Sequence, residues 1–450
     1  MKRAFWLALT AVGSFHIAWS FPSCALLIVV FLWSLYRLAA VETARQAFYF
    51  GLGIGLATFG PHLAFFWNIF QIGAVVLWII LSFWIAMFVV IGRACLRRFG
   101  PVAWACAAPF VWTGLEYFRS ELYYLRFSWL SVGYVFSNAG IGYFSAFGVY
   151  GIGFALMSVV SIWSLATQMK SRWRWAVATA VTLALALFPI CWGKKVDVSG
   201  RRLKVAGVQF EFSSPAGALE GLQHAAKLHP DAELFVLSEY SFDGPVPELI
   251  KRWCRKQGKH LIAGGKERAR SGDFYDTAFV IAPNGSNVFQ QVKCAPVQLM
   301  KDGLPAERQE VWNSPWGKIG ICICYDASYT RVVDELARQG AQALIIPTMD
   351  VIDWGARQHQ LHGRIAPMRA AEYGLPLFRV CSSGISQLVL RDGTVTATAP
   401  CPGDGAIIAG EMTLPPEGAR MPPDRILAKA SVGLTATLAF AMAILSWTKK

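Results

Sequence analysis

Three residues whose types could carry out acyl transfer follow short apolar runs in the second half of the chain. Glu239 comes after "ELFVLS", Lys293 after "NVFQQV" and Cys324 after "KIGICI". A cysteine attacks a carbonyl as the thiolate, and because an unperturbed thiol is mostly protonated near neutrality it needs a base. A carboxylate can take that proton, and a lysine can stabilise the oxyanion that forms, together with backbone N–H groups of a helix starting after the cysteine.

These three residues require a fold that brings several strand ends to one place. Between residues 201 and 412, short apolar runs alternate with polar segments of helical pattern, which is typical of an α/β domain. Residues 317–340 read as a strand, a sharp turn and a helix. Active sites of layered α/β domains gather at strand ends. The expected strands contain "LKVAGVQF", "AELFVLSEY", "HLIAGG", "TAFVIAP", "GKIGICICY", "QALIIPT", "PLFRVCS", "SQLVLRDG" and "GAIIAGEM".

The rest of the chain is far more apolar than a soluble domain. Of the 450 residues, 55% are apolar and only 16% are charged, against about 25% charged in a typical soluble domain. Each apolar run is near the roughly 20 residues that cross a bilayer as a helix. The glycine-rich "GLGIGLATFG" in one run suits close helix packing rather than dinucleotide binding. The expected spans are about 5–21, 23–40, 47–66, 72–92, 101–118, 142–167, 175–193 and 427–447.

The basic residues predict how these spans are oriented. Alternate gaps between spans, with the two chain ends, hold twelve positive charges and one acid, Glu42, a balance of +11 out of the chain's +14. By the positive-inside rule this side is cytoplasmic. The basicity is then explained by topology, so we expect no nucleic-acid partner. The prediction is a seven-helix membrane domain over 1–193, an exported domain over 194–426 and a last membrane helix over 427–450.

Other clusters of reactive side chains give weaker signals. Ten cysteines contain no CxxC pair with a matching partner, so neither a zinc site nor a disulfide framework is indicated. His359 and His362 are three residues apart without a clear third ligand, and no metal site is expected. Glu116 and Arg119, at the outer end of the fifth span, are either a functional pair or a structural one.

The order Glu, Lys and then Cys-Tyr-acid resembles the nitrilase superfamily, and the membrane spans narrow the resemblance to apolipoprotein N-acyltransferases. "LEYFRSELYYLRFSWLSVGY" with "GVYGIGF" is similar to that family's outer loop and sixth span, and "VAGVQF", "LSEYSF" and "MRAAEYGLPLFRVCSSGIS" resemble segments of its nitrilase domain. The resemblance covers nearly the whole chain. It implies a multi-pass α-helical membrane domain joined to an α/β nitrilase-like domain, an αββα sandwich.

The resemblance also assigns roles to residues. Glu239 matches the general base, Lys293 the oxyanion-stabilising lysine and Cys324 the nucleophile. Tyr325 and Asp326 match the "YE" that follows the family's cysteine, and His362 is expected to support the site. The reaction that the resemblance implies needs no metal or other cofactor. Cys322 has no catalytic counterpart, and we expect it to pack in the core.

The sequence departs from the family pattern beside the lysine. Where the family reads roughly "KxHLVPFGEY", this chain reads "KCAPVQLMKDGLPAERQE", so the second glutamate of "FGE" is absent. Asp302 is near that position but offset. Asp326 stands for a glutamate, with a side chain shorter by one methylene, and "TMDVIDW" only loosely matches the family's "NDxW".

The resemblance implies a bacterial inner-membrane enzyme whose catalytic domain is on the periplasmic side. It would move a fatty acyl chain from a phospholipid, through a cysteine thioester, to an amine such as a lipoprotein N-terminus, and we expect a monomer. Three alternatives stay open. The chain could be a conjugal-transfer paralogue of TraB type with altered or lost activity, a membrane-tethered amidase or esterase that uses water as acceptor, or a non-catalytic scaffold.

Overall fold

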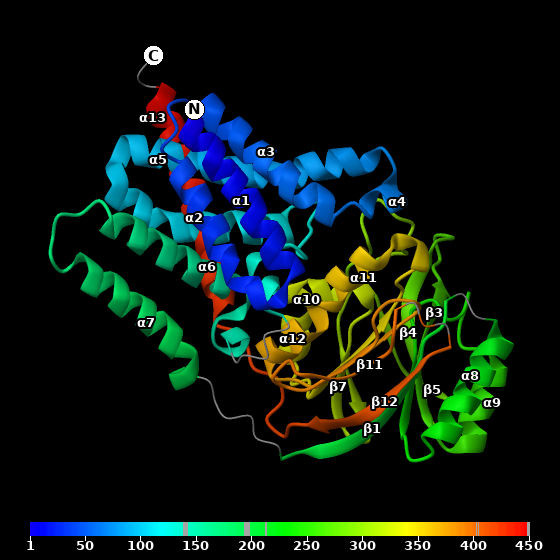
Figure 1. The fold of residues 1–450 in the computed structure, drawn as a ribbon. Coiled ribbons are helices and arrows are strands. Elements are labelled where there is room, and N and C mark those ends of the chain that lie inside the picture. The colour runs from blue at the N-terminus through cyan, green and yellow to red at the C-terminus, as the bar shows by residue number, and fades with distance from the viewer. Residues whose placement is uncertain (138–142, 193–198, 212–213, 402, 404, 448–450) are drawn as a thin grey trace. The chain divides into compact units, whose positions relative to one another are not determined.

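The computed structural model describes residues 1–450 except 138–142, 193–198, 212–213, 402, 404 and 448–450, and it divides into two compact units (Figure 1). Unit 1 holds residues 1–194 and 422–450, and unit 2 holds residues 195–421. Residue 142 of the sixth expected span, residue 193 of the seventh, and the terminal Lys449 and Lys450 lie outside the described residues.

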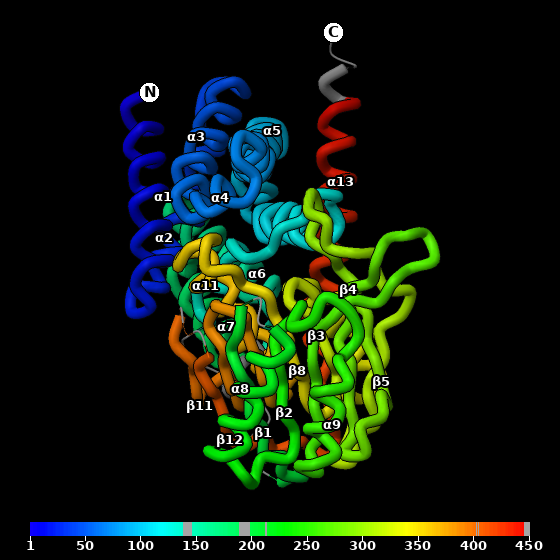
Figure 2. The backbone as a smooth tube through the Cα atoms, turned by 90° about the vertical axis from the view of Figure 1, so that its right-hand side faces the viewer, coloured from blue at the N-terminus to red at the C-terminus, as the bar shows by residue number. Residues whose placement is uncertain are grey.

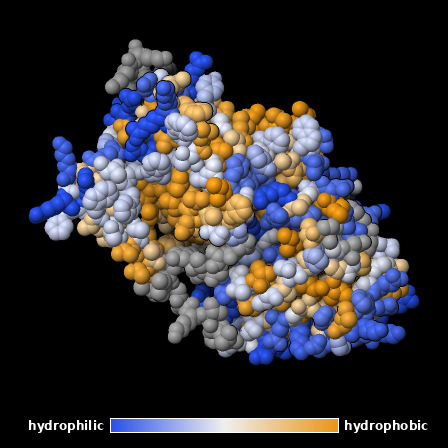
Figure 3. Space-filling model, in the orientation of Figure 1, coloured by the Kyte–Doolittle hydropathy of each residue, from blue (hydrophilic) through white to orange (hydrophobic). Residues whose placement is uncertain are grey.

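Unit 1 is helical. Its elements are α1 (Lys2–Ser20), η1 (Pro22–Leu27), α2 (Ile28–Leu38), α3 (Ala44–His62), α4 (Phe66–Phe70), α5 (Gly73–Tyr117), η2 (Phe118–Leu122), η3 (Val132–Phe136), α6 (Tyr143–Ala166), α7 (Arg174–Trp192) and α13 (Asp424–Trp447). The described part of each expected apolar run lies mostly on these helical segments. Figure 3 shows much of this unit's visible surface as apolar. Among the described residues, three helices are long and apolar enough to cross a membrane: Gly73–Leu122, Ala146–Ala166 and Asp424–Ile444.

Two expected spans are joined in α5, and a backbone break separates them. Gly100 has φ 84° and ψ −179°, which is not helical, and Pro101 follows it. Glycine adopts this φ without steric cost, and proline suits the first turn of the helix that follows. The halves before and after Gly100 correspond to the expected spans 72–92 and 101–118. The 45 residues of α5 are therefore two helices in sequence rather than one rod.

The glycine-rich run brings α3 close to α5, as the sequence predicts. A Cβ added to Gly51 would lie 2.5 Å from the Cα of Ala86, and one added to Gly55 would lie 2.6 Å from the Cα of Ser82. Any side chain at these positions would force the two backbones apart. Small residues at such contacts are a common way to pack helices in membranes.

Unit 2 is an α/β sandwich of two six-stranded sheets. The strand order is β12-β1-β2-β3-β4-β5 in the first sheet and β11-β10-β9-β8-β7-β6 in the second. Both sheets are mixed, with parallel strands in the centre (β1-β2-β3 and β7-β8-β9) and antiparallel strands toward the edges. The strands are β1 (Arg201–Val208), β2 (Leu234–Leu237), β3 (His260–Arg268), β4 (Phe274–Ile281), β5 (Asn287–Val292), β6 (Val311–Ser314), β7 (Gly317–Ile321), β8 (Ala343–Thr348), β9 (Leu377–Cys381), β10 (Gln387–Val389), β11 (Val395–Thr398) and β12 (Ile407–Leu414).

Helices cover the outer faces of the two sheets. Side chains of α8 (Pro215–Leu228) and α9 (Glu248–Gln257) share a buried core with the first sheet, in which Phe235, Leu222 and Trp253 are at most 4% exposed. On the second sheet, α12 (Ile365–Tyr373) contacts β9 and β10, and α10 (Thr330–Arg338) follows β7 after the short helix η4 (Cys324–Ser328). The remaining helices are η5 (Ile352–Trp354) and α11 (Ala356–Gly363). Figure 2 shows this unit from the side, with β1, β2 and β3 side by side.

The topology places the carboxyl ends of β2, β3 and β5 at one edge of the first sheet. β2 and β3 are parallel, and β5 runs in the same direction because β4 is antiparallel to both of its neighbours. Glu239 follows β2 and Lys293 follows β5, so both residues leave the sheet at this edge. In the second sheet, β7 and β8 are parallel, and Cys324 follows β7.

Candidate functional site

Glu239 is presented by a sharp bend just after β2. The next residue, Tyr240, has φ 52°, in the left-handed region that residues other than glycine rarely adopt. Gly264 of β3 lies against this bend, and a Cβ there would be 2.5 Å from the Cα of Glu239. Close approach of β3 to the bend therefore requires glycine at position 264. The Glu239 side chain is 1% exposed.

Cys324 lies at a second backbone bend, where β7 gives way to η4. Its own φ is 50°, so the candidate nucleophile itself is in a strained conformation. The helix expected directly after the cysteine is this short 3-10 turn, and α10 begins only at Thr330. Cys322 is fully buried, and its N–H donates to the Ile345 carbonyl of β8 at 3.1 Å. Cys322 thus belongs to the sheet core, as the sequence predicts.

Asp326 fixes the turn that carries Cys324. Its carboxylate accepts hydrogen bonds from the N–H groups of Ile323 at 3.1 Å, Cys294 at 3.0 Å and Ala295 at 2.7 Å. Burial raises the pKa of this carboxyl group to about 6, although the three N–H donors favour the carboxylate. Cys294 and Ala295 directly follow Lys293. The Asp326 side chain therefore connects the segment after the lysine to the turn that carries Cys324.

Lys293 lies at the centre of a buried ionic cluster. Its Nζ is 2.6 Å from Oε1 of Glu239, 2.7 Å from Oδ2 of Asp302 and 3.5 Å from Oδ2 of Asp276. The lysine side chain is 1% exposed. Burial alone would lower the pKa of Lys293, but the Asp302 and Glu239 carboxylates raise it well above its usual value. The lysine is therefore held as a cation among acidic groups.

The backbone at the end of β8 joins the carboxylate and the thiol. Met349 N–H donates to Oε2 of Glu239 at 2.6 Å, and Sγ of Cys324 is 3.6 Å from the Met349 carbonyl oxygen. The Glu239 carboxylate and the Cys324 thiol are close enough for each to shift the pKa of the other. Glu239, Lys293 and Cys324, which the sequence places 85 residues apart from first to last, are thus brought into one cluster.

The electrostatics of this cluster suit a thiol with a base beside it. Burial would raise the pKa of Glu239, but Lys293 and hydrogen bonds from its neighbours outweigh burial and hold that pKa below its usual value. Burial and the Glu239 charge raise the pKa of the Cys324 thiol well above its usual range. The pair at rest is therefore a carboxylate and a neutral thiol, and the thiol needs that base to become nucleophilic.

Two further carboxyl groups contact the lysine. Asp302, which the sequence marks only as an offset substitute for the missing glutamate, also accepts from the Tyr240 hydroxyl at 2.9 Å and from Val297 N–H at 2.7 Å. Asp276 is fully buried, and its Oδ2 is 3.5 Å from Lys293 Nζ. Burial and the neighbouring Glu239 charge raise the pKa of Asp276 well above its usual value.

Sequence reasoning missed Asp276, although a signal was present. The residue is an acid within the apolar strand "FYDTAFVI", where a charged side chain needs a buried partner. The ligand atoms of Glu239, Asp276 and Asp302 all lie within 4.8 Å of one another, a spacing that could hold a metal ion. Lys293 Nζ is within 3.5 Å of all three, so the cation among these carboxyl groups is the lysine ammonium.

The other predicted supporting residues lie around this cluster. Nδ1 of His362 is 2.7 Å from Oδ1 of Asp350, whose other oxygen accepts from Arg379 at 2.6 Å, so His362 belongs to a buried ionic group after β8. The Tyr325 ring packs edge-to-face on Tyr329 at 5.0 Å.

His359 and His362 do not act as a pair. His359 has its Nδ1 beside Cys401 Sγ at 2.6 Å and its Nε2 3.0 Å from the Val351 carbonyl oxygen. His362 instead contacts Asp350. The two histidines, although only three residues apart, therefore make separate contacts.

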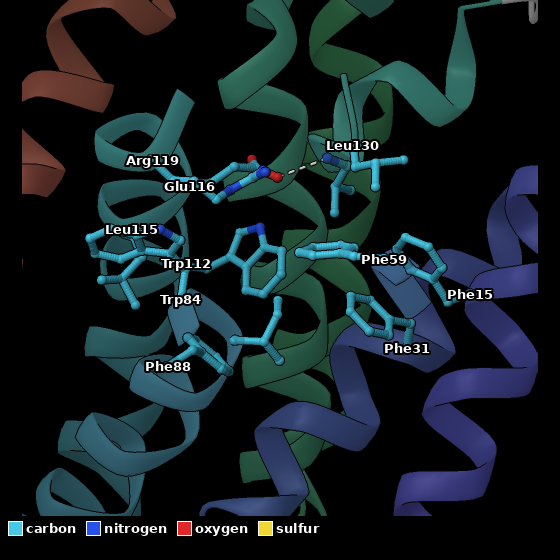
Figure 4. Close-up of a pocket in the computed structure, with 12 residues that line it drawn as sticks. Phe15, Phe31, Phe59, Trp84, Phe88, Trp112, Leu115, Glu116, Arg119 and Leu130 are labelled. Carbon is cyan, nitrogen blue, oxygen red and sulfur yellow. Dashed lines mark hydrogen bonds between the residues drawn. The ribbon is translucent and has the colours of Figure 1, made fainter. Parts of the chain in front are cut away.

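Unit 1 contains a small cavity of about 20 Å³ between its helices (Figure 4). Aromatic side chains including Phe15, Phe59 and Trp112 line it, and Glu116 and Arg119 lie at one end. Glu116 accepts from Val132 N–H at 2.8 Å, and Arg119 donates to the Phe127 carbonyl at 3.1 Å. Both charged residues hold the segment that follows α5, which favours the structural interpretation of this pair. A volume of this size is enough for about one water molecule.

Comparison with known proteins gives two family matches in succession. Residues 7–163 match the model of the apolipoprotein N-acyltransferase N-terminal domain, and residues 211–412 match the carbon-nitrogen hydrolase model. Together the two matches account for most of the chain.

Several curated relatives are similar to one or both parts. An apolipoprotein N-acyltransferase of Geobacter metallireducens is 23% identical over 428 residues, 82% of each chain. A second one, of Ralstonia nicotianae, is 22% identical over 345 residues, 68% of this chain and 65% of the relative. The omega-amidase NIT2-B of Xenopus laevis is 27% identical over 146 residues, 30% of this chain, and the match spans about half of the amidase, 48%.

Solved structures are also similar to part of this chain. A carbon-nitrogen hydrolase from Helicobacter pylori G27 is 18% identical, with a TM-score of 0.43, and the match covers 54% of this chain and 94% of that one. The family assignment comes from the two consecutive domain matches and from relatives that share both domains over most of their length. This chain belongs to the apolipoprotein N-acyltransferase family of the nitrilase superfamily.

Proposed function

We propose that this chain is a membrane N-acyltransferase that moves a fatty acyl group from a phospholipid, through a thioester on Cys324, to an amine such as the N-terminus of a lipoprotein. The observation that carries the proposal is the buried contact set of Glu239, Lys293 and Cys324. It occurs in a chain related to apolipoprotein N-acyltransferases over most of its length. The names of those relatives support the acceptor, and the phospholipid donor is part of the proposal.

In the first step Cys324 attacks the ester carbonyl of the phospholipid. The thiol proton passes to the neighbouring Glu239 carboxylate, and the S–C bond forms. The charge that develops on the carbonyl oxygen is stabilised by the Lys293 ammonium, which its acidic neighbours keep protonated. When the ester C–O bond breaks, Glu239 returns the proton to the leaving oxygen, and a lysophospholipid departs.

In the second step the amine attacks the thioester. Glu239 takes a proton from the attacking nitrogen, the C–N bond of the amide forms, and the C–S bond breaks. The cysteine sulfur leaves and recovers a proton from Glu239, which restores the starting state. All the groups that this scheme uses come from unit 2 of a single chain, so the proposed site needs no second subunit.

Asp302 bears on whether the altered sequence after the lysine is compatible with activity. Its carboxylate is 2.7 Å from Lys293 Nζ, so a second acid contacts the lysine although the "FGE" sequence is absent. We propose that Asp302 takes over the part of the missing glutamate in holding the lysine. Asp302 is offset in sequence from the family's glutamate, but the course of the backbone over residues 294–302 brings its carboxylate to Lys293. This contact favours an enzyme over a scaffold that has lost activity.

The membrane arrangement is part of the proposal. The helical unit with its apolar runs supports residues 1–193 and 427–450 as membrane segments of a bacterial inner-membrane protein, with 194–426 on the periplasmic side. The excess of basic residues in alternate gaps supports cytoplasmic ends. A nucleophile in such a domain would meet substrates that stay in the bilayer.

The decisive experiment is to trap the thioester. Purified full-length protein incubated with phospholipid should gain one acyl chain, detected by intact mass, and neutral hydroxylamine should remove it. Cys324→Ser should abolish the adduct, because a serine hydroxyl beside the same base is far less ionised than a thiol. Cys322→Ser is the matched control and should keep it. If Cys322→Ser loses the adduct and Cys324→Ser keeps it, the nucleophile has been assigned to the wrong cysteine. If the native protein gains no adduct with any phospholipid, the proposed enzymatic activity is rejected.

A further inference from the structure

A pocket of about 240 Å³ in unit 1 lies where α1 begins, α2 ends and α3 begins. Arg3 and Arg37 line it together with apolar side chains that include Leu7 and Phe50, and Glu42 lies at its rim. The volume is about that of eight water molecules at roughly 30 Å³ each, which is enough for a small polar group. The pocket therefore combines two guanidinium groups with the apolar sides of three helices.

The two arginines of this pocket are close enough for the charge of Arg3 to act on Arg37. Among the described residues, neither guanidinium group has a carboxylate within 4.0 Å, and neither has a side-chain hydrogen bond to the protein. Two like charges that share a pocket repel each other, and an anion between them would relieve that repulsion. Guanidinium groups are well suited to phosphate oxygens, because their planar N–H groups can bind two oxygens at once.

The wall of the pocket is held rigidly by contacts outside the two arginines. Arg93 of α5 donates to the Val41 carbonyl at 3.2 Å and to the Glu42 carbonyl, and so adds a third positive charge beside the pocket. Thr43 and Gln46 form a capping box at the start of α3, in which Gln46 N–H donates to the Thr43 hydroxyl at 3.1 Å. The segment that links α2 to α3 is thereby fixed, so an anion would enter a preformed site.

We infer that this pocket binds the phosphodiester headgroup of an anionic phospholipid. The phosphate would lie between Arg3 and Arg37, and the acyl chains would continue along the apolar sides of the helices. Figure 3 shows hydrophilic side chains at the end of the unit where α1 begins, beside apolar surface over the neighbouring helices. This juxtaposition of charge and apolar surface suits a lipid better than a free ion.

The inference rests on the membrane arrangement proposed above but not on the acyl transfer. On that arrangement the pocket is at the cytoplasmic leaflet, whereas the domain of Cys324 is on the opposite side. The bound lipid is therefore not the acyl donor. The charge of its headgroup would determine whether it is retained in this pocket.

Lipid retention by the full-length protein tests this inference. The protein in detergent is mixed with phosphatidylglycerol or with phosphatidylcholine of the same acyl chains, and bound lipid is counted by native mass spectrometry. We expect phosphatidylglycerol to be retained in preference. Arg37→Gln and Arg3→Gln should each weaken its retention about fivefold, the effect typical of one basic residue near anionic lipid.

Two further variants separate the pocket from general charge. Glu42→Gln removes the carboxylate at the rim and should strengthen retention, an effect opposite in sign to that of the arginine variants. Arg172→Gln removes an exposed positive charge on the α6–α7 connection, on the same predicted side but away from the pocket, and should leave retention unchanged. All four variants should melt at the same temperature as the native chain in detergent, which shows that they are folded.

Three results would overturn the inference. Equal retention of the two lipids would show that the pocket does not select an anionic headgroup. An Arg172→Gln effect as large as that of Arg37→Gln would mean that only the overall charge attracts the lipid. Displacement of phosphatidylglycerol by millimolar inorganic phosphate would identify the ligand as free phosphate rather than a lipid.

Discussion

The positive φ of Cys324 predicts an unusual response to glycine. At most buried positions, replacing alanine by glycine removes a packed methyl group and adds flexibility to the unfolded chain, and both effects destabilise the fold. At φ 50° there is an opposing effect, because glycine adopts this conformation without the strain that a Cβ imposes. Cys322 provides the comparison, since it is two residues away, is equally buried and does not have a positive φ.

The expected magnitude follows from comparing the two positions. Loss of a buried methyl and gain of unfolded-state entropy are common to both sites, so they largely cancel in the difference. What remains is the left-handed strain, about 1–2 kcal/mol for a residue other than glycine. We therefore expect the step from alanine to glycine to cost about 1–2 kcal/mol less at position 324 than at position 322. For a domain of this size, each 1 kcal/mol is about 2–4 °C in Tm.

Four variants measure this difference: alanine and glycine at position 324, and alanine and glycine at position 322. Their melting is followed on the full-length protein in detergent by intrinsic tryptophan fluorescence. If the step from alanine to glycine lowers Tm equally at the two positions, the backbone at Cys324 is not strained and the reasoning fails. Thioester formation gives an independent check, because both variants at position 324 must lose it and Cys322→Ala must keep it.

Three other expectations concern the cluster and the topology. Glu239→Gln and Lys293→Met should each slow thioester formation by about 10²-fold or more while the protein stays folded, and near-normal rates in purified protein would break the proposed triad. Asp276→Asn should gain stability relative to the native chain as pH rises above about 4: the pKa of Asp276 is higher in the fold than in the unfolded chain, so between those two pKa values the native chain loses up to roughly 1.4 kcal/mol per pH unit that the variant does not lose. A Tm difference that stays constant from pH 5 to pH 7 would show that Asp276 is ionised in the fold. Reporter fusions at residue 300 should be active only for a periplasmic reporter, and activity of a cytoplasmic one would reverse the proposed topology.

The sequence was most informative where a periodic pattern and a chemical need coincide. Glu239, Lys293 and Cys324 could be singled out because each follows an apolar strand, and strands that run in the same direction end at the same edge. Two strands were not predicted, Val311–Ser314 and Val395–Thr398, because they are four residues long and carry polar side chains that do not stand out from a loop. The expected boundaries of the membrane and exported domains stay predictions.

What escaped prediction depends on contacts between distant segments. Asp276 is on β4 and Lys293 directly follows β5, 17 residues later, and neither segment by itself indicates that the two side chains meet. Asp302 reaches the lysine only because the segment from Cys294 to Asp302 doubles back, with Val297 N–H bound to the same carboxylate that contacts Lys293. The left-handed φ of Cys324 is likewise set by the Asp326 contacts and not by the cysteine's own preference.

The closed ionic cluster has a consequence for the dependence of the reaction on salt. In the proposed scheme the thiol proton moves from Cys324 to Glu239 and back, so the total charge of the cluster stays the same throughout the acyl transfer. No ion has to enter or leave a site in which the lysine is 1% exposed. Mobile ions screen charges that are in contact with solvent, over about 8 Å at physiological ionic strength, and they screen buried pairs much less. A rate of thioester formation that changes with salt would therefore report on the arrival of the lipid at the protein surface, while the bond-making step itself should not respond.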